Sequence, residues 1–193
     1  GLWCSSIGTN DTEIFVTHSG MAFIYKHADE NRILQRIPGF LGTCEKELWI
    51  NSLSVLYNLQ TESDHQLLYL AECYLTDYWK IVICNENGAL LTEFTLNISS
   101  IKVTAYCAKK VLSSTGDISS LSINLAIATS DHILRVVQCV INNPVVIGNS
   151  KQWKQIAIYP TETEITQLFT LDDSQFKILA GDRQGQIHCY VLL

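Results

Sequence analysis

The sequence predicts an all-β fold built from a repeated unit of strand, turn and strand. Three observations lead to this prediction: 47% of the 193 residues are hydrophobic, the apolar residues come in short runs separated by polar turns, and these turns recur at a nearly constant spacing. The apolar content allows a sizeable buried core. A regular period of this kind is typical of repeat architectures.

Four segments have the pattern of a β-hairpin, in which two apolar runs flank a short polar turn. These segments cover residues 13–25, 67–84, 124–137 and 176–193. Taking Gly20, Asp77, Asp131 and Gly185 as equivalent turn positions gives spacings of 57, 54 and 54 residues. One supersecondary unit per repeat fits this period.

The apolar residues of the hairpins are successive rather than alternating, as in Ile14-Phe15-Val16 and Ile81-Val82-Ile83. Such strands need both faces covered, and the blades of a β-propeller cover one another in this way. Further strand candidates flank the hairpins at 89–94, 101–107, 153–159 and 165–171. The sequence therefore predicts a single β-propeller or partial propeller over residues 1–193, with four-stranded antiparallel blades at 2–41, 46–97, 98–160 and 161–193.

One segment allows two readings. In residues 45–59, Trp49, Leu53, Leu56 and Tyr57 follow a helical spacing. The segment is therefore either a strand of the second blade or a short helix.

Residues 178–190, ILAGDRQGQIHCY, resemble the second and third strands of a WD-repeat (WD40-like) blade. Tyr190 stands where that family usually has tryptophan, and the sequence contains no Trp-Asp dipeptide. The resemblance implies a non-catalytic scaffold for protein–protein interaction within a larger complex. It also implies structural roles in turns for Asp131, Asp182 and Gly185.

Four tryptophans, Trp3, Trp49, Trp79 and Trp153, are candidates for partner contacts if they lie on the surface, and core residues otherwise.

The last repeat ends after its third strand. We therefore expect the chain to be a C-terminal run of about four blades, completed by another segment or by a partner chain. A second possibility is that residues 2–7, including Trp3, close the last blade beside residues 186–193.

Charge and cysteine usage limit the function classes. The net charge of −6 and the scattered basic residues predict no direct DNA binding. An alternative is an accessory subunit of an RNA-modifying or RNA-processing enzyme, which requires a folded basic patch around Lys102, Lys109 and Lys110.

Seven singly spaced cysteines without a Cys-x-x-Cys pair favour free thiols in the cytoplasm or nucleus, although the sequons at Asn10 and Asn97 are those of secreted proteins. No apolar run reaches the length of about 18 residues needed to span a membrane.

No sequence pattern indicates catalysis. The five histidines, His18, His27, His65, His132 and His188, are scattered, and neither metal-ligand spacings nor catalytic or phosphate-binding motifs occur. We therefore expect no enzyme activity, no metal and no cofactor. A propeller hydrolase, whose catalytic residues come from separate blades, is a less favoured alternative.

Overall fold

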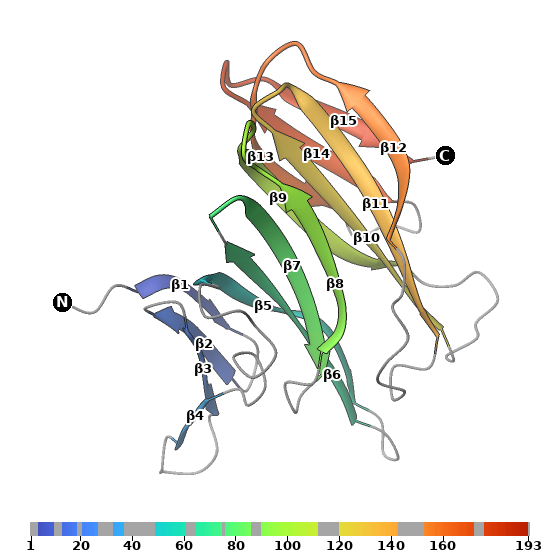
Figure 1. The fold of residues 1–193 in the computed structure, drawn as a ribbon. Coiled ribbons are helices and arrows are strands. Elements are labelled where there is room, and N and C mark those ends of the chain that lie inside the picture. Colours follow the sequence, from blue (N-terminus) through green and yellow to red (C-terminus); the bar gives the residue numbers. More distant parts are fainter. Residues whose placement is uncertain are drawn as a thin grey trace. The chain divides into compact units, whose positions relative to one another are not determined.

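The computed structural model is all-β in the part of the chain that it describes (Figure 1). That part comprises residues 4–9, 13–18, 21–26, 33–36, 49–60, 65–74, 76–85, 90–111, 120–142, 153–171 and 176–192. Its strands form antiparallel sheets, and neighbours in sequence are neighbours in each sheet. The predicted fold class is confirmed.

The chain divides into two compact units, Gly1–Ser99 and Ser100–Leu193. The strands of the first unit are β1 (Cys4–Thr9), β2 (Glu13–His18), β3 (Met21–Lys26), β4 (Ile33–Arg36), β5 (Trp49–Gln60), β6 (His65–Tyr74), β7 (Tyr78–Asn85) and β8 (Leu90–Asn97). They form two sheets of four strands, β1–β4 and β5–β8.

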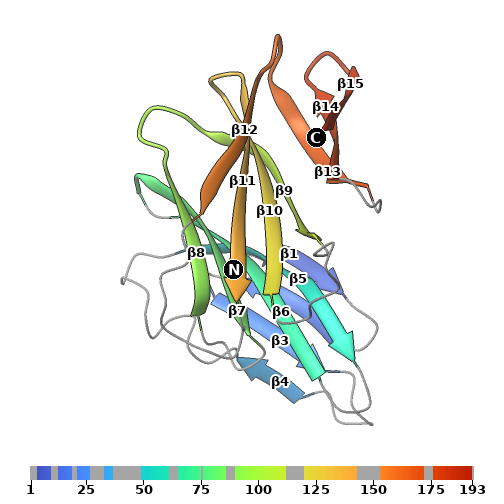
Figure 2. The ribbon, with the colours of Figure 1, turned by 90° about the vertical axis from the view of Figure 1, so that its right-hand side faces the viewer.

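The strands of the second unit are β9 (Val103–Val111), β10 (Ser120–Thr129), β11 (Ile133–Asn142), β12 (Lys154–Pro160), β13 (Ile165–Thr170), β14 (Lys177–Asp182) and β15 (Ile187–Val191). Strands β9–β12 form a sheet of four and β13–β15 a sheet of three, both visible from the side in Figure 2. The blade boundaries given above and the single domain remain predictions.

The four predicted hairpins are present as the pairs β2–β3, β6–β7, β10–β11 and β14–β15. Inner strands are the most buried, because sheets or side chains cover both of their faces. Every residue from Ile123 to Thr129 in β10 is buried, and so is Ile81–Cys84 in β7. In the outer strands β8 and β12, exposed residues alternate with half-buried ones over much of the strand. This explains their mixed apolar and polar sequences.

Residues 49–60 form strand β5, so the helical reading is wrong for them, whereas residues 45–48 lie outside the described part. Strand β5 pairs with β6 along its length, and the register shifts between Ile50 and Ser52 and again between Val55 and Tyr57. Each β-bulge inserts an unpaired residue and breaks the two-residue alternation. The two bulges therefore account for an apolar spacing that is not that of a regular strand.

The N-terminal strand does not close the last sheet. Residues Cys4–Thr9 pair with β2 as the first strand of the first sheet, which contradicts the second possibility, that residues 2–7 close the last blade beside residues 186–193. Trp3 itself lies outside the described residues. The described residues include no helix that could cross a bilayer.

In the second unit, a hydrophobic core lies between the two sheets. It joins Ala126, Ala128, Leu134 and Val136 of the four-stranded sheet to Ile165, Leu168, Ile178 and Ala180 of the three-stranded one. One face of the β13–β15 sheet is thus covered by the unit itself.

Candidate functional site

The turn between β14 and β15 is organised by the carboxylate of Asp182. Its Oδ1 accepts hydrogen bonds from the backbone N–H groups of Gln184 (2.9 Å) and Gln186 (2.8 Å). Its Oδ2 accepts one from Thr163 Oγ1 (2.6 Å) and lies 3.0 Å from His188 Nε2. One buried side chain therefore holds the turn, the preceding loop and the edge strand.

These contacts favour the ionised form of Asp182. The hydrogen bond from Thr163, followed by that from His188 and those from the turn backbone, holds the pKa of Asp182 well below its usual value. The arrangement satisfies the carboxylate rather than exposing it, which is typical of a structural aspartate and not of a general base.

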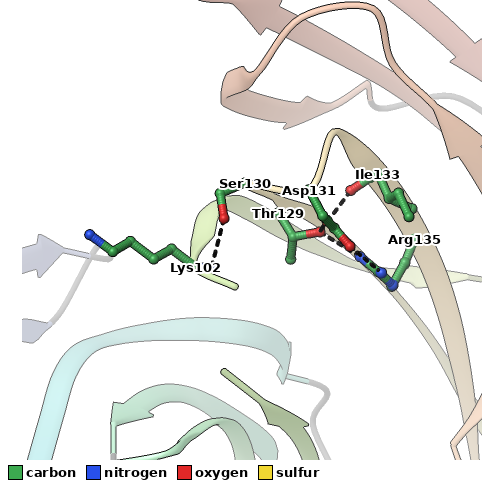
Figure 3. Close-up of polar contacts among 6 residues, drawn as sticks. All are labelled: Lys102, Thr129, Ser130, Asp131, Ile133 and Arg135. Atoms are coloured by element: carbon green, nitrogen blue, oxygen red, sulfur yellow. Dashed lines mark hydrogen bonds and ion pairs between the residues drawn. The ribbon is translucent and has the colours of Figure 1, made fainter. Parts of the chain in front are cut away.

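The turn between β10 and β11 has a comparable polar network, shown in Figure 3. Arg135 contacts Asp131 through Nη2 and Oδ2 at 2.8 Å, and its Nη1 donates to Thr129 Oγ1. Thr129 Oγ1 donates to Asp131 Oδ1 and also lies 3.1 Å from the Ile133 carbonyl oxygen. The hydrogen bond with the Arg135 guanidinium, the largest cause, lowers the pKa of Asp131.

The two turns correspond position by position, with one correction to the predicted alignment. Gly185 N donates to the Asp182 carbonyl at 3.1 Å, and His132 N donates to the Thr129 carbonyl at 3.1 Å. Both Gly185 (φ 82°) and His132 (φ 60°) have positive φ. The equivalent of Gly185 is therefore His132, one residue beyond Asp131, and the equivalent of Asp182 is Thr129.

The same backbone hydrogen bonds recur at the ends of successive sheets. The first residue after a fourth strand donates to a turn carbonyl, as Ile98 does to Asp77 and Thr161 to His132, both at 2.8 Å. The residue preceding a first strand accepts from the turn, as Lys102 does from Ser130 and Glu164 from Arg183. These matching contacts support the repeat that the sequence predicts.

A buried polar pair lies in the first unit. Trp79 Nε1 donates to Glu72 Oε1 at 2.9 Å, and Tyr74 Oη donates to the same oxygen at 3.1 Å. Burial, together with the neighbouring Glu72 carboxylate, raises the pKa of Tyr74. Trp79 also packs edge-on against Phe94, with ring centroids 6.5 Å apart.

The tryptophans have different environments. Trp79 is 0% exposed, so it is a core residue and its interpretation as a partner contact is wrong. Trp153 is half-buried just before β12. Trp49 begins β5, but its side chain lies outside the described part, as does Trp3.

An exposed apolar sheet face was missed by sequence reasoning. On β13–β15, the side opposite the core carries the apolar residues Phe169, Leu179, Ile187, Cys189 and Val191, which we call the outer face, beside Gln167, Lys177 and Gly181. The register places Phe169, Leu179 and Cys189 in one cross-strand row. Phe169 is 61% exposed and Ile187 76%. The available signal was the alternation of Ile187, Cys189 and Val191 along the last strand.

The lysines proposed for RNA binding do not gather. Lys102 directly precedes β9, and Lys109 lies seven residues later within that strand. Seven residues of an extended strand span about 23 Å. The Lys109 ammonium donates to the Leu171 carbonyl. Within the described part of the chain, no group of three or more metal-ligating side chains occurs.

Comparison with solved structures places this fold among known ones. The whole chain aligns with the WD40 domain of SCAP from fission yeast, with a TM-score of 0.61 and 8% identity, and spans 42% of that chain. In the complex of the fission yeast SREBP–SCAP binding domains, 97% of the chain aligns with a TM-score of 0.60 and 9% identity, and it spans 45% of that chain. The fold is that of a partial β-propeller.

A further likeness is to Drosophila Plexin A in complex with Semaphorin 1b. The whole chain aligns with a TM-score of 0.51 and 9% identity, and spans 55% of that chain. No family model and no curated protein matches the sequence. At these identities the structural likeness establishes the fold alone.

Proposed function

We propose that this chain is a non-catalytic scaffold that binds protein partners within a larger complex. The observation that carries the proposal is the outer face of β13–β15, where Phe169 and Ile187 are 61% and 76% exposed. Large apolar side chains gathered on one face of a folded protein are typical of a protein interaction site. The register also places the charged Lys177 opposite Val191 and the polar Gln167 opposite Gly181 on this side of the sheet.

The fold supports the same proposal. The fission yeast SCAP WD40 domain, whose fold this chain shares, occurs in a complex of SREBP–SCAP binding domains. We further propose that the chain is a run of four WD-repeat blades from the C-terminal part of a propeller. Its span of less than half of the two WD40-domain chains is consistent with this.

The cysteines support a reducing compartment, the cytoplasm or nucleus. Among the described residues, Cys84, Cys107 and Cys189 are free thiols. Burial raises the pKa of the Cys107 thiol to about 12 and also raises that of Cys84. Thiols that stay protonated are poor nucleophiles, so Cys84 and Cys107 act as core residues.

The test is to identify partners by cross-linking in cells that express the full chain, and then to reconstitute binding with the purified partner. Phe169→Thr and Ile187→Thr each introduce threonine, whose β-branched side chain suits a strand, and both should weaken binding tenfold or more, measured by calorimetry. A matched control is Ile158→Thr on β12, because Ile158 is also exposed (49%) but lies in a different sheet.

Binding that survives both outer-face variants, or that Ile158→Thr weakens equally, contradicts the proposal. Binding abolished by ribonuclease would instead favour the RNA-processing alternative.

A further inference from the structure

The four-stranded sheet β9–β12 extends beyond the three-stranded sheet that covers one of its faces (Figure 2). Strands β10 and β11 have ten residues each, whereas β14 has six and β15 five. On the covered face of β11, exposure rises with distance from the turn: Leu134 and Val136 are buried, Gln138 is half-buried and Val140 is 46% exposed. On the opposite face, Cys139 is still buried. The far end of the covered face is therefore accessible.

A row of four polar side chains crosses the sheet where this accessible end begins. The register pairs Asn124 with Lys109 on one side and Gln138 on the other, and it pairs Gln138 with Lys154. Residues that are directly opposite across strands share a face of the sheet. The next row toward the turn is apolar and consists of Cys107, Ala126, Val136 and Ala157. The core thus ends at the polar row, and we call its four residues together with Val140 the shelf.

The two amide side chains in the middle of the row form a pair that suits a peptide group. Asn124 is 2% exposed, and its Oδ1 accepts a hydrogen bond from Gln138 Nε2 at 2.9 Å. This bond leaves Asn124 Nδ2 as a donor and Gln138 Oε1 as an acceptor for a further partner. A peptide backbone offers both a C=O and an N–H group. The pair can therefore bind the backbone of an extended segment.

The two lysines at the ends of the row favour negative charge. The Lys109 ammonium donates to the carbonyl of Leu171, the residue after β13, so it lies where the covering sheet ends. Lys154 is exposed at the start of β12. None of the five shelf residues carries a carboxylate. An acidic segment therefore complements the charge of the shelf.

The distance between the lysines sets the spacing of the acidic residues. Lys109 and Lys154 are three strand-to-strand steps apart, which is about 14 Å. An extended segment rises by about 3.3 Å per residue, and every second side chain lies on the same side. Two acidic residues four positions apart are thus separated by about 13 Å and can each meet one lysine.

We propose that the shelf binds an extended acidic segment of a partner protein. Two acidic residues four positions apart pair with Lys109 and Lys154, and the backbone between them bonds the Asn124–Gln138 pair. This rests on the proposed scaffold function and adds to it a second binding surface, which lies on a four-stranded sheet and shares no residue with the outer face.

The first experiment uses two short peptides of equal composition and charge. The probe SDVSVDS, acetylated and amidated at its ends, has its aspartates four positions apart. In the control SVDSDVS they are two positions apart and span only about 7 Å. In NMR titrations of the full chain, the probe should bind about threefold more tightly, because the control can pair with only one lysine. The side-chain amide signals of Asn124 and Gln138 should shift with the probe.

Lysine variants identify the contacts. Lys109→Met and Lys154→Met should each weaken probe binding about threefold and abolish the preference for the probe over the control peptide. Lys154 is exposed, so Lys154→Met decides the question even where Lys109→Met impairs folding. The matched control is Lys102→Met, since Lys102 is also exposed but directly precedes β9 at the other end of the sheet. It should leave the affinity unchanged.

Several results overturn the proposal. These are equal affinities of the two peptides, unchanged amide signals of Asn124 and Gln138 at millimolar probe, and equal weakening by Lys102→Met, which would indicate unspecific attraction. Displacement of the probe by a uridine oligonucleotide that requires the same lysines overturns it in favour of RNA.

The chain's own acidic residues Asp172 and Asp173 are a further possible occupant; they follow Leu171 in the sequence and lie outside the described residues. If they occupy the shelf, Asp172→Asn together with Asp173→Asn shifts the amide signals of Asn124 and Gln138 without any peptide, and this result also overturns the proposal.

The purified partner separates this proposal from the scaffold function. Weaker binding of the partner to Lys154→Met than to Lys102→Met supports the proposal. A partner that needs Phe169 and Ile187 of the outer face but neither shelf lysine refutes it and leaves the scaffold function standing. If no partner binds, the scaffold function fails and the proposal fails with it, even where the probe binds.

Discussion

Replacing Trp79 by phenylalanine tests the buried polar pair of the first unit. The indole is 0% exposed, and its N–H donates to Glu72 Oε1 at 2.9 Å. Phenylalanine keeps an aromatic ring but removes this donor, and leaving a buried acceptor with one partner fewer costs about 1–3 kcal/mol. The smaller ring also leaves a cavity, which adds about 1 kcal/mol. We therefore expect Trp79→Phe to lower the free energy of unfolding by about 2–4 kcal/mol.

The matched control is the adjacent residue on the same strand. Tyr78 is 43% exposed, so Tyr78→Phe should change stability by less than about 0.5 kcal/mol. Urea unfolding followed by hydrogen exchange, resolved by peptide, measures the two units separately. If Trp79→Phe destabilises the first unit no more than Tyr78→Phe does, the pair with Glu72 contributes nothing and the reasoning is refuted.

Three further predictions concern the turns of the second unit. The folded-state pKa of Asp182 is lowered, so the ionised carboxylate stabilises the fold above its unfolded pKa of about 4, and this stabilisation is lost as the pH falls. The urea midpoints of the wild type and of Asp182→Asn should therefore differ at pH 7 and converge toward pH 2. A difference that stays constant with pH would contradict this. Arg135→Met should raise the pKa of Asp131 toward its ordinary value, because it removes the largest cause of the lowering; carboxyl-carbon NMR titration measures this, and an unchanged pKa would show that Arg135 is not the cause. Gly185→Ala should lower the free energy of unfolding by about 1 kcal/mol because φ is positive at this position. Gly181→Ala should have little effect, because an added Cβ there meets only Gln167 Cβ at 3.7 Å. Equal urea midpoints for the two variants would show that the positive φ of Gly185 does not limit stability.

The hairpins could be predicted from the sequence because local rules determine them. Inner strands covered on both faces require continuous apolar runs, and polar turns separate these runs. Strand β5 could not be assigned with the same certainty, because the bulges after Ile50 and after Val55 disturb the alternation on which strand prediction depends. Likewise, the turn alignment was one residue out because the positive φ of His132 leaves no mark in the sequence.

The Glu72–Trp79 pair shows a second limit. The two residues are seven apart, and the hairpin register that places Glu72 opposite Ile81 and Tyr74 opposite Trp79 brings them together. A single glutamate within the apolar run LLYLAECYL was the available signal, because a buried carboxyl group needs donors nearby. Which donor it finds depends on register, and register depends on the whole sheet.

The outer face could not be predicted from β15 alone, because exposure depends on which other elements are present. The position of β15 itself, however, depends on its neighbouring turn. Asp182 binds the amides of Gln184 and Gln186 directly before β15 and contacts His188 within it. The buried aspartate thus fixes the start of β15 in its extended conformation.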